Sequence, residues 1–171
     1  MVDSFINFIF AKMAKIHYVT GDATNPVAVG KKIIVHVCND IGAWGAGFVL
    51  ALSKKWKDPE AVYKKSFGKQ EKVKPVLGNV QYVFVEDNIV VANMIAQRSC
   101  GFSEDGIPPI RYGALRACLA DVNNEAYRIG ATLHMPRIGC GLAGGEWKEI
   151  EKILQDVLSV DAYVYDLPAK A

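Results

Sequence analysis

Two glycine-rich segments of the sequence have the residue types expected of an anion-binding site. The first, residues 36–47, reads HVCNDIGAWGAG, and the second, residues 137–142, reads RIGCGL. Glycine lets main-chain N–H groups approach a negatively charged ligand, and a helix that begins within such a loop adds a favourable dipole. Each segment taken alone is equally compatible with a tight structural turn.

The first segment does not match the common nucleotide-binding patterns. It has neither the GxxxxGK[ST] order of a P-loop nor the GxGxxG order of a dinucleotide-binding turn. Both segments follow strand-like runs, and apart from Arg137, which belongs to the expected strand before the second loop, neither segment holds a lysine or arginine. A ligand with two linked phosphates needs two sets of donors, so the pair of loops predicts a pyrophosphate held by main-chain amides.

Side chains able to transfer protons accompany the first loop. His36 precedes it, and a histidine that titrates near neutral pH could protonate a leaving oxygen or activate a water. The alternative is a core histidine bonded to the backbone, and this structural role is expected for His17 and His134. Asp40 is either a partner carboxylate or a loop residue facing water. Cys140 lies in a glycine nest that would stabilise a thiolate, but the sequence offers it no clear histidine partner.

Strand-like and helix-like segments alternate along the chain and would position these loops. Apolar, β-branched runs predict strands, whereas apolar residues three or four apart predict helices. The expected strands are residues 15–20, 32–38, 80–86, 89–96, 133–138 and 162–167, and the expected helices are residues 48–56, 59–67, 112–129 and 147–158. This order predicts an α/β fold, a three-layer α/β/α domain with a central mixed β-sheet, in which ligands bind beyond the carboxyl ends of the strands.

Composition limits the classes of protein to which the chain could belong. Its 171 residues are 51% hydrophobic and carry a net charge of +2, which suits one globular domain and predicts no strong binding to nucleic acid. We expect an N-terminal extension over residues 1–14 and the domain over 15–171. No apolar run approaches the ~20 residues of a membrane span. The four cysteines have neither CxxC nor zinc spacing, so we expect reduced thiols in a cytoplasmic, monomeric protein without a metal or cofactor.

Three motifs together resemble the macrodomain family. Residues 21–24 (GDAT) are similar to its early Gly-Asp motif. Residues 36–39 followed by 44–47 are similar to its first ligand loop, and residues 136–142 followed by Trp147 to its second loop and the next helix. The similarity spans about residues 15–167. It is greatest with the branch that contains ADP-ribose-1″-phosphate phosphatases and terminal ADP-ribose protein glycohydrolases.

The resemblance implies ADP-ribose or a derivative as the ligand and a role for each matched position. Asp22 would accept a hydrogen bond from the adenine amino group, with the backbone of Ala23 beside it. Asn39 would hold hydroxyls of the distal ribose. Trp44, Gly45, Ala46, Gly47 and Phe48 would line that ribose and its phosphate, and Ile138, Gly139, Cys140, Gly141 and Leu142 would wrap the diphosphate.

The same resemblance leaves three activities open. Glycohydrolases of this branch use a lysine and an aspartate, which align with Gln97 and Ala143 here, and neither residue can supply that chemistry. The resemblance therefore favours a phosphatase that hydrolyses ADP-ribose 1″-phosphate, with His36, Asn39 and Asp40 as the candidate catalytic residues. A reader that binds without turnover is the next alternative, and a glycohydrolase that uses Asn39 and an ordered water is the third.

Overall fold

A computed structural model gives the structure of the chain and describes residues 13–170. Most of the expected N-terminal extension, residues 1–14, lies outside the described residues. Six strands form one sheet in the order β1-β6-β5-β2-β4-β3. Their bounds are β1 Ile16–Thr20, β2 Lys32–Asn39, β3 Val80–Glu86, β4 Ile89–Gln97, β5 Thr132–Met135 and β6 Ala162–Asp166. All neighbouring strands are parallel except β3 and β4, which confirms the mixed sheet.

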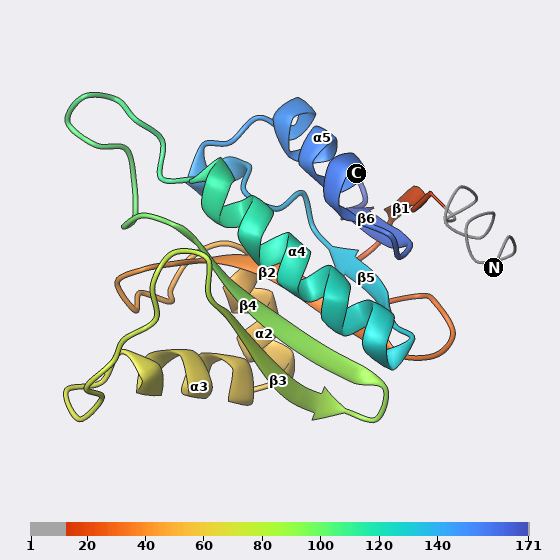
Figure 1. Cartoon of the computed structure of the whole chain (residues 1–171), viewed down its shortest axis with the longest axis horizontal. Coiled ribbons are helices and arrows are strands. Elements are labelled where there is room, and N and C mark those ends of the chain that lie inside the picture. The colour runs from red at the N-terminus through yellow and green to blue at the C-terminus, as the bar shows by residue number, and fades with distance from the viewer. Residues whose placement is uncertain (1–12, 171) are drawn as a thin grey trace, which may run out of the picture.

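Helices cover both faces of the sheet and confirm the three-layer arrangement (Figure 1). The helices are α2 Phe48–Lys55, α3 Asp58–Ser66, α4 Tyr112–Ile129 and α5 Trp147–Val157. Alternate residues of β2 point to opposite cores. Ile33 packs beneath α4 and α5, whereas Ile34 packs beneath α2 and α3. This alternation explains the nearly continuous apolar run of β2, which is buried on both faces.

The helix α4 has the bounds that its periodicity predicts. Five apolar residues spaced three or four apart are fully buried against the sheet: Leu115, Cys118, Leu119, Val122 and Ala126. Gly130 follows in the left-handed conformation, with φ of 71°, and its N–H bonds to the carbonyls of the last turn. Glycine takes this conformation without a steric penalty, which is why the helix ends there.

Two turns determine the pairing of β3 with β4 and the point at which β5 ends. The turn at Asp87-Asn88 joins β3 to β4 as an antiparallel hairpin, and Asn88 has a φ of 66°. The expected strand over residues 133–138 is shorter than predicted, since β5 ends at Met135. Pro136 has no N–H to donate to a ladder, so the chain turns there and releases residues 136–140 into the second glycine loop.

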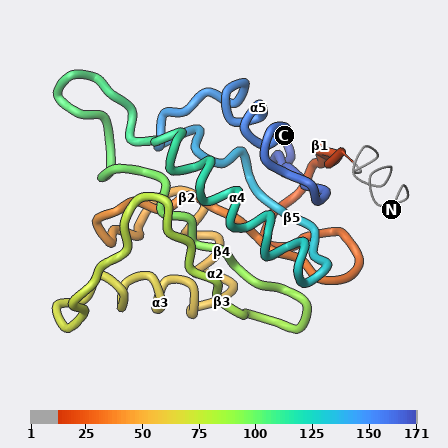
Figure 2. The backbone as a smooth tube through the Cα atoms, viewed as in Figure 1, coloured from red at the N-terminus to blue at the C-terminus, as the bar shows by residue number. Residues whose placement is uncertain are grey.

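The five parallel strands all end at the same edge of the sheet. The backbone tube in Figure 2 shows the connection between β4 and α4 leaving this edge as a long excursion. That excursion returns against the second loop, where a Cβ built on Gly144 would lie 2.8 Å from atoms of Phe102 and Pro108. No helix in the described part of the chain is long and apolar enough to cross a membrane.

Candidate functional site

A cavity of about 810 Å³ opens at the carboxyl edge of the sheet, between the two glycine loops. The first loop contributes residues 43–49 and the second residues 136–143 to its wall, with the end of β2 as its floor. The two loops meet where Gly47 lies beside Leu142, since a Cβ built on Gly47 would lie 3.7 Å from the Leu142 Cδ1. The fold therefore places both candidate donor sets around one space.

Asn39 fixes the shape of the first loop. Its Oδ1 accepts hydrogen bonds from the main-chain N–H of Ile41 at 3.1 Å and of Ala43 at 3.0 Å, and its Nδ2 donates to the carbonyl of Ala43 at 2.7 Å. The hydroxyl of Tyr63 lies 2.6 Å from the same Oδ1. The side-chain oxygen is thus occupied by the chain itself, and one proton of Nδ2 is left to meet a ligand hydroxyl.

The stretch after Asn39 presents unpaired amides to the cavity. Gly42 has a φ of 78°, and a Cβ there would lie 2.8 Å from Phe67, so this position requires glycine. The indole of Trp44 donates to Ser53 of α2 at 2.8 Å and forms a largely buried wall. The N–H groups of residues 45–47 make no hydrogen bond within residues 13–170, and Gly47 begins α2 without a side-chain cap. These N–H groups are free to bind an anion.

The second loop offers a similar set of donors. Gly139 has a φ of 71°, and a Cβ there would lie 2.9 Å from Ile150 of α5. Its carbonyl accepts from Gly145 at 2.8 Å, which closes the loop around a short 3₁₀ turn, η1, at Gly141–Ala143. Among the described residues, the N–H groups of Ile138 and Gly139 have no acceptor in the chain. The second loop can therefore donate to a second anionic group in the same cavity.

His36 contributes to the cavity wall from a buried position. Its side chain is 2% exposed, its Nε2 lies 2.6 Å from Oδ1 of Asn93, and its ring meets Trp44 edge-on at 5.4 Å between centroids. Burial lowers the pKa of His36 to about 4, although the bond to Asn93 opposes that shift. The expectation that His36 titrates near neutral pH is therefore wrong, since the ring is neutral throughout the physiological range.

Asp40 makes two hydrogen bonds to the end of β4 and the loop that follows it. Its carboxylate accepts from the N–H of Ser99 at 2.8 Å, and its own N–H donates to the carbonyl of Gln97 at 3.0 Å. Asp40 does not line the cavity, whereas Gln97 and Ala143 do. The two positions that the resemblance aligns with the lysine and aspartate of the glycohydrolases thus line the candidate ligand space with an amide and a methyl group.

Asp22 lies at the same sheet edge but outside the lining of the cavity. One carboxylate oxygen accepts from both the N–H and the hydroxyl of Thr24 at 2.8 Å, and the methyl of the neighbouring Ala23 is buried. Asp22 follows β1, which β6 separates from β5. Two strand spacings place it roughly 10 Å from the second loop, a distance that an extended nucleoside can bridge.

The thiols around the cavity are poorly suited to nucleophilic attack. Burial raises the pKa of Cys140, with Arg137 opposing the shift, and raises that of Cys38 well above its usual value. The glycine nest therefore does not yield the thiolate that its position suggests. Within residues 13–170, no three His, Cys, Asp or Glu side chains cluster as metal ligands would.

The sequence prediction missed two groups at the site. Arg137 lines the cavity, forms a bidentate pair with Asp166 at 2.7 and 2.8 Å, and lies over the rings of Tyr18 and Trp147. Its partners are far away in sequence, so no local pattern shows this cluster. Asn93, which holds His36, does leave a local signal, because it is a polar residue within the buried run IVVANMIAQ of β4.

Known proteins identify the fold family. No protein-family model matches the chain. The solved structure of a macrodomain protein from Streptomyces coelicolor is 42% identical, superposes with a TM-score of 0.77, and is matched over 89% of this chain and 99% of that one. The chain belongs to the macrodomain family. Its fold and the order of its three motifs are those that the resemblance implies.

Other relatives of this macrodomain carry names that concern function. A Candida albicans protein named ADP-ribose 1″-phosphate phosphatase is 26% identical over 166 residues, which cover 88% of the macrodomain and 98% of the relative. A mouse protein named chromodomain-helicase-DNA-binding protein 1-like is 29% identical over 165 residues. The match covers 90% of the macrodomain but only 18% of that much longer protein.

Proposed function

We propose that this macrodomain binds ADP-ribose or a close derivative in the cavity between its two glycine loops. The observation that carries the proposal is the pair of unpaired N–H sets, at residues 45–47 and 138–139, that face one space. Each set suits one phosphate of a diphosphate. The free proton on Asn39 suits a hydroxyl of the distal ribose, and an estimated separation of roughly 10 Å between Asp22 and the second loop would suit the adenine.

The reaction that we propose is hydrolysis of ADP-ribose 1″-phosphate to ADP-ribose and phosphate. Water would attack the phosphorus, the bond from phosphorus to the 1″ oxygen would break, and that oxygen would leave as the hydroxyl of ADP-ribose. Support comes from the matched length of the relative named as this phosphatase and from His36 in the cavity wall. A neutral imidazole accepts a proton from water, but a base with a pKa of about 4 does so weakly near pH 7, so we expect slow turnover.

Replacing His36 with glutamine should reduce phosphate release about tenfold and leave ADP-ribose affinity nearly unchanged. Glutamine keeps a donor for Asn93 but loses the basic ring nitrogen. The measurement pairs a phosphate assay on ADP-ribose 1″-phosphate with calorimetry on ADP-ribose. Binding without any release in the unaltered protein would exclude the phosphatase and leave the reader, whereas equal release from both proteins would remove His36 from the mechanism.

Release of ADP-ribose from modified protein is the second candidate function, and the cavity gives it less support. Gln97 donates to the carbonyl of Ser99 at 2.9 Å, and Ala143 presents only a methyl group. Neither residue can form a covalent sugar adduct or act as a base. Incubation with an ADP-ribosylated protein tests this candidate, because ADP-ribose release at a rate above that of the phosphatase reaction would reverse the order of preference.

Replacing Asp22 with asparagine should weaken binding of ADP-ribose about tenfold and improve binding of the inosine analogue. Asparagine keeps an oxygen for Thr24, so the turn is preserved, but it presents a donor where the adenine amino group needs an acceptor. Hypoxanthine has an acceptor at that position and would pair with the new donor. Calorimetry with both nucleotides checks the exchange, and equal losses for the two ligands would argue against contact between Asp22 and the base.

A further inference from the structure

A hydrogen-bond chain, part-buried at its outer end and buried at its inner end, runs from α3 to the ring of His36. It begins where the hydroxyl of Ser66 donates to the main-chain carbonyl of Tyr63 at 2.6 Å. A carbonyl oxygen only accepts, so this bond uses the one proton of the hydroxyl. The Ser66 oxygen then accepts from Nε2 of Gln81 at 2.7 Å, which turns the Gln81 oxygen toward β4.

The chain continues through Asn93, whose side chain is fully buried. Its Nδ2 donates to the oxygen of Gln81 at 3.3 Å and to the carbonyl of Pro59 at 3.1 Å. Both partners are acceptors, so the amide has only one orientation that satisfies them. That orientation presents Oδ1 of Asn93 to Nε2 of His36, its neighbour in the register of β2 and β4, at 2.6 Å.

We propose that Asn93 is a positioning residue that holds His36 as the neutral tautomer with its proton on Nε2. The carbonyls of Pro59 and Tyr63, both in α3, set the direction of every bond in the chain. The only acceptor that the ring retains is then Nδ1. The proposal rests on the function proposed above and specifies how His36 acts in it. A histidine in this tautomer can accept a proton only at Nδ1, and because Nδ1 carries no proton it cannot donate one to a substrate.

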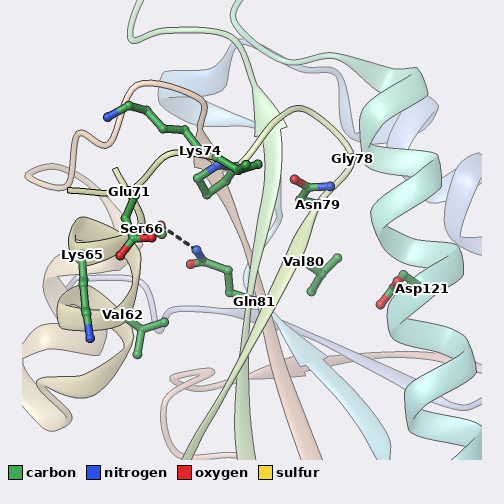
Figure 3. A pocket seen from close by; sticks show the side chains of 12 residues that line it. Val62, Lys65, Ser66, Glu71, Lys74, Gly78, Asn79, Val80, Gln81 and Asp121 are labelled. Carbon is green, nitrogen blue, oxygen red and sulfur yellow. Dashed lines mark hydrogen bonds between the residues drawn. The ribbon is translucent and has the colours of Figure 1, made fainter. Parts of the chain in front are cut away.

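The outer end of this hydrogen-bond chain lies in a second hollow of about 670 Å³, between α3, the 71–79 segment and α4. Figure 3 shows Gln81 pointing from β3 toward Ser66 of α3, with the bond between them drawn, and Lys65 on the same helix. Gln81 lines this second hollow and not the cavity between the loops. A substitution of Gln81 therefore alters the hydrogen-bond chain without changing a residue that lines the cavity.

The wild-type protein gives the first test. Nitrogen NMR of uniformly labelled protein near pH 7 should show His36 with a protonated Nε2 and an unprotonated Nδ1, in roughly tenfold excess over the other tautomer, the ratio that one net buried hydrogen bond supplies. This measurement needs no turnover and no ligand, so its failure is separate from a failure of the proposed function. A protonated Nδ1, or an even mixture of tautomers, would overturn the assignment.

Variants then locate the cause. Replacing Asn93 with leucine removes the acceptor and should reduce the tautomer excess at least threefold. Gln81→Glu keeps an oxygen facing Asn93 and should preserve the excess, and Lys65→Ala, in the same hollow but outside the hydrogen-bond chain, should also preserve it. If Asn93→Leu does not fold, Gln81→Leu gives the graded version, with a smaller loss because Pro59 still orients Asn93. An unchanged tautomer ratio in Asn93→Leu would show that Asn93 does not position the ring, and an unchanged ratio in Gln81→Leu would show that the bond from Asn93 to Gln81 adds nothing to its orientation.

Discussion

Lowering the pH from 6.5 to 4 should cost the folded chain roughly 3 kcal/mol of unfolding free energy for each of two buried histidines. Burial lowers the pKa of His36 to about 4 and that of His134 to about 4, from an ordinary value of 6.5. The unfolded chain therefore binds more protons than the folded chain between these values. Stability is fully present above pH 6.5 and is lost as the pH falls toward 4.

Denaturant unfolding at several pH values between 7 and 4 measures this loss, which is a large share of the ~5–15 kcal/mol typical of a domain. His134→Gln is the matched variant, because glutamine can still bond to the hydroxyls of Thr132 and Tyr165 that hold the ring at 2.8 and 2.7 Å. It should remove about half of the pH dependence. A pH dependence that survives in a variant lacking both histidines would place the effect on carboxylates instead.

The architecture could be predicted because its causes are local in sequence. The 3.6-residue spacing of apolar side chains in α4 and the glycine that follows it determine where that helix starts and ends. The continuous apolar run of β2 shows that it is buried on both faces, which requires helices above and below the sheet. The prediction that the strand β5 runs through residue 138 was wrong. It followed the apolar character of the segment, although Pro136 has no N–H to donate to a neighbouring strand, and β5 ends at Met135.

The site could be predicted only in part, because only some of its features are local in sequence. Each glycine loop is a contiguous stretch of sequence, so both loops can be recognised from the sequence alone. The partners of the polar side chains are not contiguous. His36 bonds to Asn93 and Asp40 bonds to the backbone of Ser99, contacts that exist only after β2 and β4 pair. Whether a histidine is a catalyst near neutral pH or a buried neutral ring depends on such contacts, which spacing alone does not reveal.

Replacing Gly45 with aspartate should reduce ADP-ribose affinity about a hundredfold, because a carboxylate close to the diphosphate at an effective dielectric of about 20 costs roughly 3 kcal/mol. Gly45 has no positive φ and a Cβ there would meet no atom within 4 Å, so the fold should tolerate the change. The residue lines the cavity next to the free N–H groups of the first loop.

Asparagine at the same position is the matched control, since it has the shape of aspartate without the charge. Calorimetry at low and high salt should show a large difference between the two variants that shrinks as salt screens the repulsion. The charge, and not the added volume, then accounts for the loss. Equal affinities for the two variants would mean that the phosphates do not lie against the first loop. The proposal that the N–H groups of this loop bind the diphosphate would then be wrong.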